Sequence, residues 1–298
     1  MTAAGRPAPV RRRVRLARGP VTIGEPAAAI EARLAAAEPY RPDTIADGGS
    51  AFGLTVRAAS VRGLYKRYTG GPRQDDICLR LHADSGTLIA AVADGVSGAV
   101  RSDLGAALAV RYATAAVARF LDGGPSASMD WAAVFEQAAW ALVEEHRRAS
   151  GDGEAGVEAA SSSLATTLLV AVVCGSDVEV AAVGDSPAFV LAGKEYDALV
   201  GEPEHFDGLV GGGVDALPRS AGDVRVASCS LDPGAVLLLC TDGLAMPLAG
   251  GGGDVGATLA RELARPPDIV DFARLLDFSR STYDDDRSLI AVWRSDES

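Results

Sequence analysis

The sequence is poor in the residues that most often signal redox or zinc chemistry. Its 298 residues include four cysteines and three histidines, and only 5% are aromatic. The cysteines, Cys78, Cys174, Cys229 and Cys240, lie singly in apolar runs without a C-x-x-C spacing. They predict reduced core thiols rather than disulfides. Without a matching group of His and Cys, the sequence does not indicate a zinc site.

Two further absences narrow the function. No stretch reaches the roughly 20 uninterrupted apolar residues of a membrane span, and no signal-peptide core follows the N-terminal charges. We therefore expect a cytoplasmic protein that does not engage a membrane. A formal charge of −12 disfavours a nucleic-acid partner, which would need clustered Lys and Arg on the folded part.

The basic residues cluster only near the start, in Arg11, Arg12, Arg13, Arg15 and Arg18. This run lies among Ala, Pro and Gly without a clear apolar period, which predicts a mostly disordered Arg- and Ala-rich arm over residues 1–47. A mitochondrial presequence is the alternative, although it would normally be richer in Ser. Residues 48–298 can bury a substantial core. We expect them to form a single domain, and the protein to be a monomer.

Residue patterning predicts strands in clustered hairpins and helices in pairs. Strand-like runs cover residues 52–61, 77–81, 87–92, 164–174, 178–183, 189–191, 224–228, 236–240 and 289–293. Helical spacing covers residues 103–121, 130–148, 254–263 and 267–279. Clustered hairpins favour antiparallel sheets, with the helices covering their outer faces. We therefore expect an α+β fold, a four-layer α/β/β/α sandwich with two antiparallel sheets flanked by helix pairs.

Aspartates recur at the ends of the predicted strands. Three apolar runs lead into Asp94, Asp185 and Asp242, and a fourth follows residues 284–286, which are all Asp. A single Asp-Gly pair is most simply a turn. Several carboxylates converging at one sheet edge, however, would be costly to bury without cations. Oxygen ligands suit Mn²⁺ or Mg²⁺, so the set predicts two divalent cations that activate a water for attack on phosphate.

Six short motifs occur in a familiar order. They are Arg73-Gln74-Asp75, Ala93-Asp94-Gly95-Val96-Ser97, Ser163 to Leu168, Val183-Gly184-Asp185-Ser186, Thr241-Asp242-Gly243-Leu244 and Asp285-Asp286-Arg287-Ser288. Together they resemble the motifs of the protein phosphatase 2C family, the metal-dependent PPM-type Ser/Thr phosphatases, in its bacterial form. The resemblance spans about Phe52 to Arg294. It implies a signalling hydrolase that acts on phosphoserine and phosphothreonine in a protein substrate, with a cognate Ser/Thr kinase.

The resemblance also implies residue roles. Asp94 corresponds to the ligand that bridges both metals, and the Gly95 carbonyl to a further ligand of one of them. Asp242 and Asp285 correspond to ligands of the other metal. Asp75 corresponds to an outer carboxylate of the metal site that holds metal-bound water. The expected catalytic residues are therefore Asp75, Asp94 and Asp242.

Some assignments stay open at this stage. Asp284 and Asp286 are the alternatives to Asp285 as the metal ligand. Asp185 could contact a metal or serve only as a turn residue. For the third metal of bacterial relatives, only Glu154 and Glu158 are available.

Departures from the family pattern affect the substrate side of the site. Val96 stands where eukaryotic members have a His, and Gly70 stands where the phosphate-binding Arg is usual. Arg73, or else Arg67, is then the candidate for substrate binding, and an exposed surface Arg is the plainer interpretation of either. Residues 195–220 occupy the place of the family's flap. A regulatory binding module and a small-molecule phosphoesterase are the alternative functions.

Overall fold

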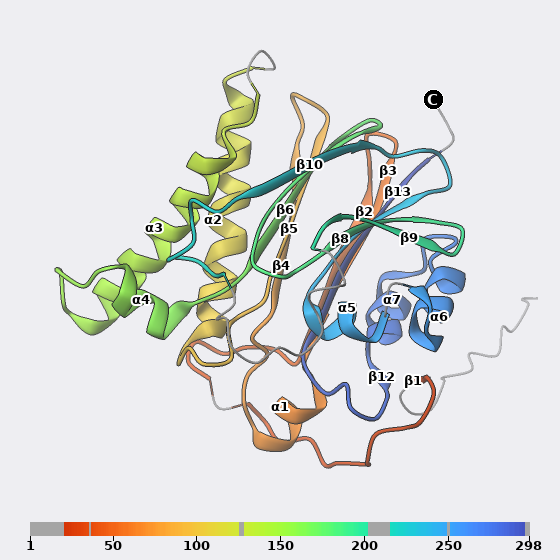
Figure 1. The fold of residues 1–298 in the computed structure, drawn as a ribbon, viewed down its shortest axis with the longest axis horizontal. Helices are drawn as coiled ribbons and strands as arrows, with labels where there is room; N and C mark the ends of the chain where they lie inside the picture. The colour runs from red at the N-terminus through yellow and green to blue at the C-terminus, as the bar shows by residue number, and fades with distance from the viewer. Residues whose placement is uncertain (1–20, 36, 125–127, 202–214, 249–250, 296–298) are drawn as a thin grey trace, which may run out of the picture.

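Two antiparallel sheets form the centre of the molecule (Figure 1). The structure is a computed structural model that describes residues 21–35, 37–124, 128–201, 215–248 and 251–295. One sheet contains β4 (Asp76–His82), β5 (Thr87–Ala93), β6 (Leu168–Cys174), β7 (Asp177–Val183) and β10 (Arg225–Ser230). The other contains β2 (Thr44–Ala51), β3 (Leu54–Val61), β8 (Ala188–Ala192), β9 (Glu195–Val200), β11 (Val236–Cys240) and β13 (Arg287–Arg294). Their orders are β10-β7-β6-β5-β4 and β2-β3-β13-β11-β8-β9.

Helices cover the outer faces of both sheets (Figure 1). On the five-stranded side lie α2 (Ser102–Asp122), α3 (Trp131–Ser150) and α4 (Val157–Leu164). On the six-stranded side lie α5 (Asp242–Leu248), α6 (Asp254–Glu262) and α7 (Ile269–Leu276), and the short α1 (Leu64–Thr69) lies at one end. The predicted α/β/β/α sandwich is confirmed, and α2, α3, α6 and α7 lie close to the predicted helices. A third helix on each side, α4 and α5, was not predicted, so the expected pairs are sets of three.

The burial pattern of β5 shows that both faces of its sheet are covered by apolar side chains. Every residue of β5 is buried. Ile89 and Ala91 belong to the core shared with α2 and α3, whereas Ala90 and Val92 belong to the core between the two sheets. Successive strand side chains point to opposite faces, so a continuous apolar run is stable only where both faces are covered.

The helix α2 is, among the described residues, the one that is long and apolar enough to cross a membrane. More than half of its apolar window is buried inside the molecule. Ala106, Val110 and Val117 pack in the core between this helix, α3 and the five-stranded sheet. The apolar character of α2 is therefore explained by its place in the core.

The segment from residue 21 to 47 differs from the predicted disordered arm. β1 (Val21–Thr22) pairs in parallel with β12 (Phe278–Ser279), and Ile23 is buried. Arg41 Nη2 lies 2.9 Å from Asp76 Oδ2. The predicted boundary between residues 47 and 48 falls inside β2, so this part of the arm belongs to the domain. The predicted disorder of residues 1–20 lies outside the described residues.

Candidate active site

Antiparallel pairing brings the predicted aspartates to one end of the sandwich. β5 and β7 run in the same direction because each is antiparallel to β6, so Asp94 and Asp185 follow at the same end. β11 is antiparallel to β13, so Asp242, which follows β11, and Asp285, which precedes β13, also share an end. These four carboxylates line one pocket of about 250 Å³. The strand directions therefore place each pair of carboxylates at one end of its sheet, and the packing of the two sheets joins the pairs in one pocket.

Asp94 and Asp242 form the most tightly linked pair in this pocket. Burial raises the pKa of Asp94 well above its ordinary value, and the charges of Asp75 and Asp242 raise it further. Burial also raises the pKa of Asp242, while a hydrogen bond with Asp94 opposes the shift. Carboxylates that repel each other in this way hold a proton, or are neutralised by a divalent cation. The donor set therefore fits a hard cation.

Asp185 belongs to the same acidic pocket. It lines the pocket beside Asp242. Burial raises the pKa of Asp185, and the charge of Asp242 raises it further. The Gly-Asp-Ser turn therefore delivers a carboxylate to the site, which a turn role alone would not require.

Asp75 lies behind the pocket, and hydroxyl groups hold its carboxylate. Thr241 Oγ1 and Ser288 Oγ each donate a hydrogen bond of 2.7 Å to Asp75 Oδ2. Burial raises the pKa of Asp75 well above its ordinary value, and the charge of Asp286 raises it further. Asp75 is not among the residues that line the pocket. Its position fits the outer role implied by the family resemblance.

Arg73 is buried next to Asp75 and does not face the pocket. Its side chain is 1% exposed, and Nη1 donates to Ser60 Oγ at 2.8 Å and to the Asp75 carbonyl. Ser60 Oγ also lies at a hydrogen-bond distance of 2.7 Å from Ser288 Oγ. A guanidinium committed to internal acceptors cannot reach a substrate phosphate in this conformation. In this structure Arg73 therefore supports Asp75, and its position does not favour the predicted substrate-binding role.

Lys66, which belongs to none of the sequence motifs, brings a positive charge to the acidic site. Its Nζ lies 3.7 Å from Asp285 Oδ1 and 3.9 Å from Asp286 Oδ2. Arg67, the other sequence candidate, instead pairs with Asp43 and Asp277 at 2.6 Å each. The cation beside the site is therefore Lys66, and the predicted candidate Arg67, which is next to it in sequence, points to other partners. The helix α1 that orients Lys66 was too short to be recognised from periodicity.

The three consecutive aspartates before β13 have different surroundings. Asp286 is 2% exposed and accepts hydrogen bonds from Gly63 N at 2.7 Å and Gln74 N at 2.6 Å. Asp285 lines the pocket, and its side chain is 53% exposed. Asp284 is exposed and is not among the lining residues. These positions favour Asp285 as the ligand.

The acidic side chains are near one another without forming a finished metal site. Among the described residues, no three Asp, Glu, His or Cys groups lie close enough together to hold an ion as they stand. Asp285 Oδ1 accepts a 2.9 Å hydrogen bond from Asp286 N. The carboxylates are therefore gathered in one pocket but do not yet have a coordinating arrangement.

Two threonines from the motif of Ser163 to Leu168 hold the turn after β5. Thr167 Oγ1 accepts a hydrogen bond from Asp94 N at 3.0 Å. Thr166 Oγ1 donates to the Asp94 carbonyl at 2.9 Å. A Cβ on Gly95 would lie 2.7 Å from Ser102 O, so only glycine allows this turn to lie against α2. These contacts fix the main chain at the centre of the site.

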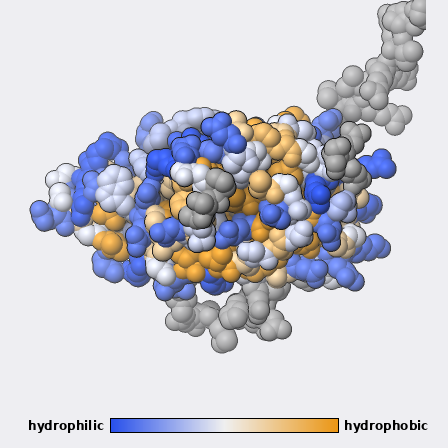
Figure 2. Space-filling model, turned by 90° about the horizontal axis from the view of Figure 1, so that it is seen from above, coloured by the Kyte–Doolittle hydropathy of each residue, from blue (hydrophilic) through white to orange (hydrophobic). Residues whose placement is uncertain are grey.

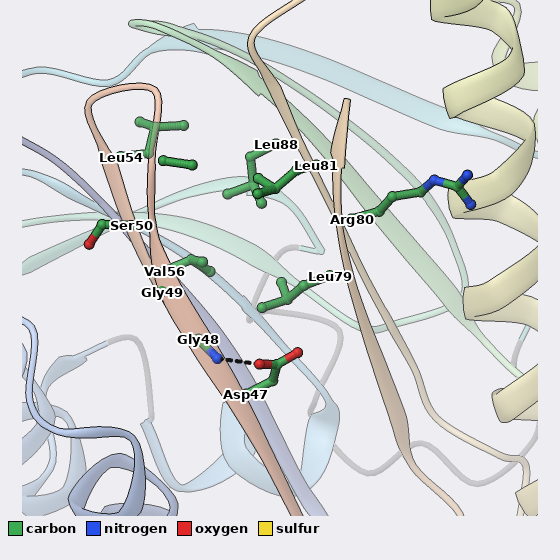
Figure 3. A pocket seen from close by; sticks show the side chains of 11 residues that line it. Asp47, Gly48, Gly49, Ser50, Leu54, Val56, Leu79, Arg80, Leu81 and Leu88 are labelled. Atoms are coloured by element: carbon green, nitrogen blue, oxygen red, sulfur yellow. Dashed lines mark hydrogen bonds between the residues drawn. The ribbon is translucent and has the colours of Figure 1, made fainter. Parts of the chain in front are cut away.

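Another pocket lies away from the carboxylates (Figure 3). It has a volume of about 260 Å³ and lies between β2 and β4, the outer strands on one side of the sandwich. Leu54, Leu79 and Leu88 line it, and the Asp47 carboxylate accepts a 2.7 Å hydrogen bond from Gly48 N. Seen from above the orientation of Figure 1, the molecule shows apolar residues among hydrophilic ones (Figure 2). This pocket has the chemistry of a core edge rather than of a catalytic site.

Comparison with known proteins agrees with this geometry. A search of curated protein sequences finds no match. Among solved structures, the chain is similar to the S. agalactiae serine/threonine phosphatase, with 16% identity and a TM-score of 0.54, covering 80% of this chain and 99% of that one. It is similar to PppA, a regulatory component of the T6SS in Pseudomonas aeruginosa, with 19% identity and a TM-score of 0.54, covering 83% and 99%.

A third solved structure is the catalytic domain of the serine/threonine phosphatase PstP in complex with two manganese ions. It shares 19% identity with this chain, with a TM-score of 0.51, and the match covers 82% of this chain and 99% of that one. At these identities the likeness shows the fold. The sequence profile of protein phosphatase 2C matches residues 62–285, which include all the predicted site residues. The chain belongs to the protein phosphatase 2C family.

Proposed function

We propose that this chain is a metal-dependent protein phosphatase that hydrolyses phosphoserine and phosphothreonine, using two Mn²⁺ or Mg²⁺ ions. The observation that carries the proposal is the single pocket lined by Asp94, Asp185, Asp242 and Asp285, which come from strand ends of both sheets. Asp94, Asp242, Asp285 and the Gly95 carbonyl would hold the ions. Bound ions of this kind lower the pKa of water and neutralise charge on the phosphate.

The chain's own residues support the remaining steps of hydrolysis. Lys66 places a positive charge beside Asp285 and Asp286, where it lowers the pKa of Asp242 and of Asp286 against the effect of burial. Val96 lines the pocket and has no proton to donate, so the leaving seryl or threonyl oxygen takes its proton from solvent. No cysteine or histidine lies among the lining residues in the described part of the chain. We therefore propose direct hydrolysis without a covalent enzyme intermediate.

Two alternatives are less well supported by the site. A regulatory module without catalysis would be expected to have lost carboxylates, yet Asp75, Asp94 and Asp242 are all present and buried or partly buried. A phosphoesterase for small molecules would use the same acidic pocket. Turnover of phosphopeptides compared with nucleotides and sugar phosphates separates this alternative from the proposal.

The cellular setting follows from the same proposal. We propose that the protein is a cytoplasmic, bacterial signalling enzyme that acts as a monomer, opposes a Ser/Thr kinase and does not bind nucleic acid. The four cysteines are free thiols, which suits a reducing compartment. The net charge of −12 suits a protein substrate better than a polyphosphate backbone.

Phosphate release from a phosphothreonine peptide tests the proposed function. The wild type is assayed with Mn²⁺, with Mg²⁺ and with EDTA, and compared with Asp242→Asn. We expect metal-dependent release that falls on the order of 100-fold or more in the variant, because loss of even an outer partner of a metal ligand costs 10- to 100-fold. The exposed Asp84, at the far end of β5, provides Asp84→Asn as a control of equal charge. Wild-type turnover in Asp242→Asn would exclude the proposed site.

A further inference from the structure

A second cleft opens beside the catalytic pocket and shares part of its wall. Val96 and Gly98 line both the pocket and the cleft. The cleft has a volume of about 600 Å³, compared with about 250 Å³ for the pocket. The walls of the cleft come from the loop after β5, from α4 and from residues 215–220. A substrate bound at the carboxylates would therefore have this cleft next to it.

Main-chain hydrogen bonds fix the cleft relative to the catalytic turn. Val96 N donates to Ala165 O at 3.0 Å. Thr166 and Leu217 exchange two hydrogen bonds, at 2.8 and 3.2 Å. Thr167 N donates to Asp94 O at 2.8 Å. The three segments that form the cleft are thus joined to the residue at the centre of the site, and the cleft is preformed.

The floor and the walls of the cleft differ in chemistry. Ala99, Ala165 and Ala216 form a small buried cluster, against which Val96 packs. The walls carry the carboxylates of Glu158 and Asp215, both of which are exposed. An apolar floor with acidic walls complements a side chain that has an aliphatic stem and a cationic end. Lysine and arginine are the two side chains with this construction.

One wall already holds a guanidinium. Arg219 Nε donates to Glu158 Oε1 at 3.2 Å, and Arg219 Nη2 donates to Glu158 Oε2. Glu158, one of the two carboxylates considered for a third metal, is therefore already paired. Asp215 receives only a 3.5 Å hydrogen bond from Ser220 Oγ and forms no ion pair with another residue that the structure describes. Asp215 is thus the carboxylate available to an incoming cation.

We propose that the cleft binds a lysine or arginine side chain of the phosphoprotein substrate, with Asp215 as its anchor. The proposal rests on the phosphatase function proposed above and adds a sequence preference to it. The basic residue lies within a few positions of the phosphoserine or phosphothreonine, because an extended chain advances about 3.3 Å per residue and the cleft adjoins the catalytic pocket. The preference arises from pairing between the substrate cation and Asp215 on an apolar floor.

Matched phosphothreonine peptides test the proposal. In one series a single lysine is moved through the positions on either side of the phosphothreonine, and in the other series glutamine replaces it. We expect one or two positions at which lysine raises kcat/KM about two- to fivefold, the range of an exposed ion pair. The series also separates this proposal from the proposed function. Metal-dependent turnover of all peptides at equal kcat/KM overturns only the cleft assignment, whereas no turnover of any peptide overturns the phosphatase.

The variant Asp215→Asn identifies the anchor. We expect the lysine-to-glutamine ratio of kcat/KM to fall to about one, and Asp84→Asn, with the same change in net charge, to keep the wild-type ratio. In Asp215→Lys, a glutamate peptide should become the preferred substrate. An unchanged ratio in Asp215→Asn overturns the proposal. So does an equal loss in both Asn variants, because the preference would then come from net charge.

Discussion

Replacing Arg73 with methionine distinguishes a structural cation from one that binds substrate. The side chain is 1% exposed, and its guanidinium donates to Ser60 Oγ at 2.8 Å and to the Asp75 carbonyl. Methionine fills a similar volume without making either hydrogen bond. If the guanidinium supports Asp75, the substitution should lower stability and turnover together.

The size of the effect follows from the contacts that are lost. Hydrogen bonds to a charged group contribute about 1.5–3 kcal/mol each, and removing a buried charge returns part of this. Asp76 keeps its 2.9 Å ion pair with Arg41, so no carboxylate is left alone. We expect the free energy of unfolding to fall by about 2–4 kcal/mol. For a domain of this size the Tm should fall by about 5–15 °C.

Thermal unfolding followed by circular dichroism measures the loss of stability, and peptide kinetics below the transition measure kcat and KM. We expect kcat to fall while KM changes less than about threefold, because Asp75 is displaced and the phosphate-binding surface is not. Arg148→Met, at a side chain that is 73% exposed, should leave the Tm unchanged. A raised KM with an unchanged Tm in Arg73→Met would refute this reasoning and restore the substrate-binding role.

Further predictions concern the acidic pocket and one close approach of the main chain. In the unfolded chain, Asp75 and Asp94 lose their protons as the pH rises above about 3.8. In the metal-free folded protein their pKa values are raised, so both side chains keep their protons to higher pH. Urea unfolding in EDTA should therefore show stability falling as pH rises from about 4 toward 8. Asp94→Asn should abolish turnover yet raise the metal-free stability at pH 8 by about 1–2 kcal/mol. A Cβ on Gly243 would lie 2.0 Å from Asp286 O. Gly243→Ala should therefore lower stability by about 1–3 kcal/mol, whereas Gly49→Ala, with open space around it, should be neutral in the same assay.

The fold was predictable where apolar runs were long and bounded by turns. The hairpin of β4 and β5 and the helix that begins after Asp130 lie where expected, and Asp130 accepts the capping hydrogen bond from Ala133 N at 3.0 Å. β2 was not predicted because its sequence contains Gly48 and Gly49 and few apolar residues. That strand is held by pairing with β3, which local sequence does not encode. The helices α1 and α4 were missed because they are too short to show a period.

The acidic site was predictable because its carboxylates lie at the ends of apolar strands. Asp94, Asp242 and Asp285 each adjoin an apolar strand, and antiparallel pairing brings such positions together. The cations were not predictable in the same way. Whether an arginine near the site is buried depends on contacts such as that of Arg73 with Ser60, which are distant in sequence. Lys66 was not predicted because the family pattern places its phosphate-binding Arg at the position that Gly70 occupies in this chain, four residues after Lys66.

The position of β13 inside its sheet has a consequence for how the enzyme is made. This strand pairs on one side with β3 and on the other with β11, and Asp285 lies two residues before its start. During synthesis, a nascent chain that has not yet produced residues 285–294 therefore lacks both a central strand and one member of the acidic site. Closing contacts over such long sequence separations is slow. Catalytic competence should thus appear late in synthesis and all at once.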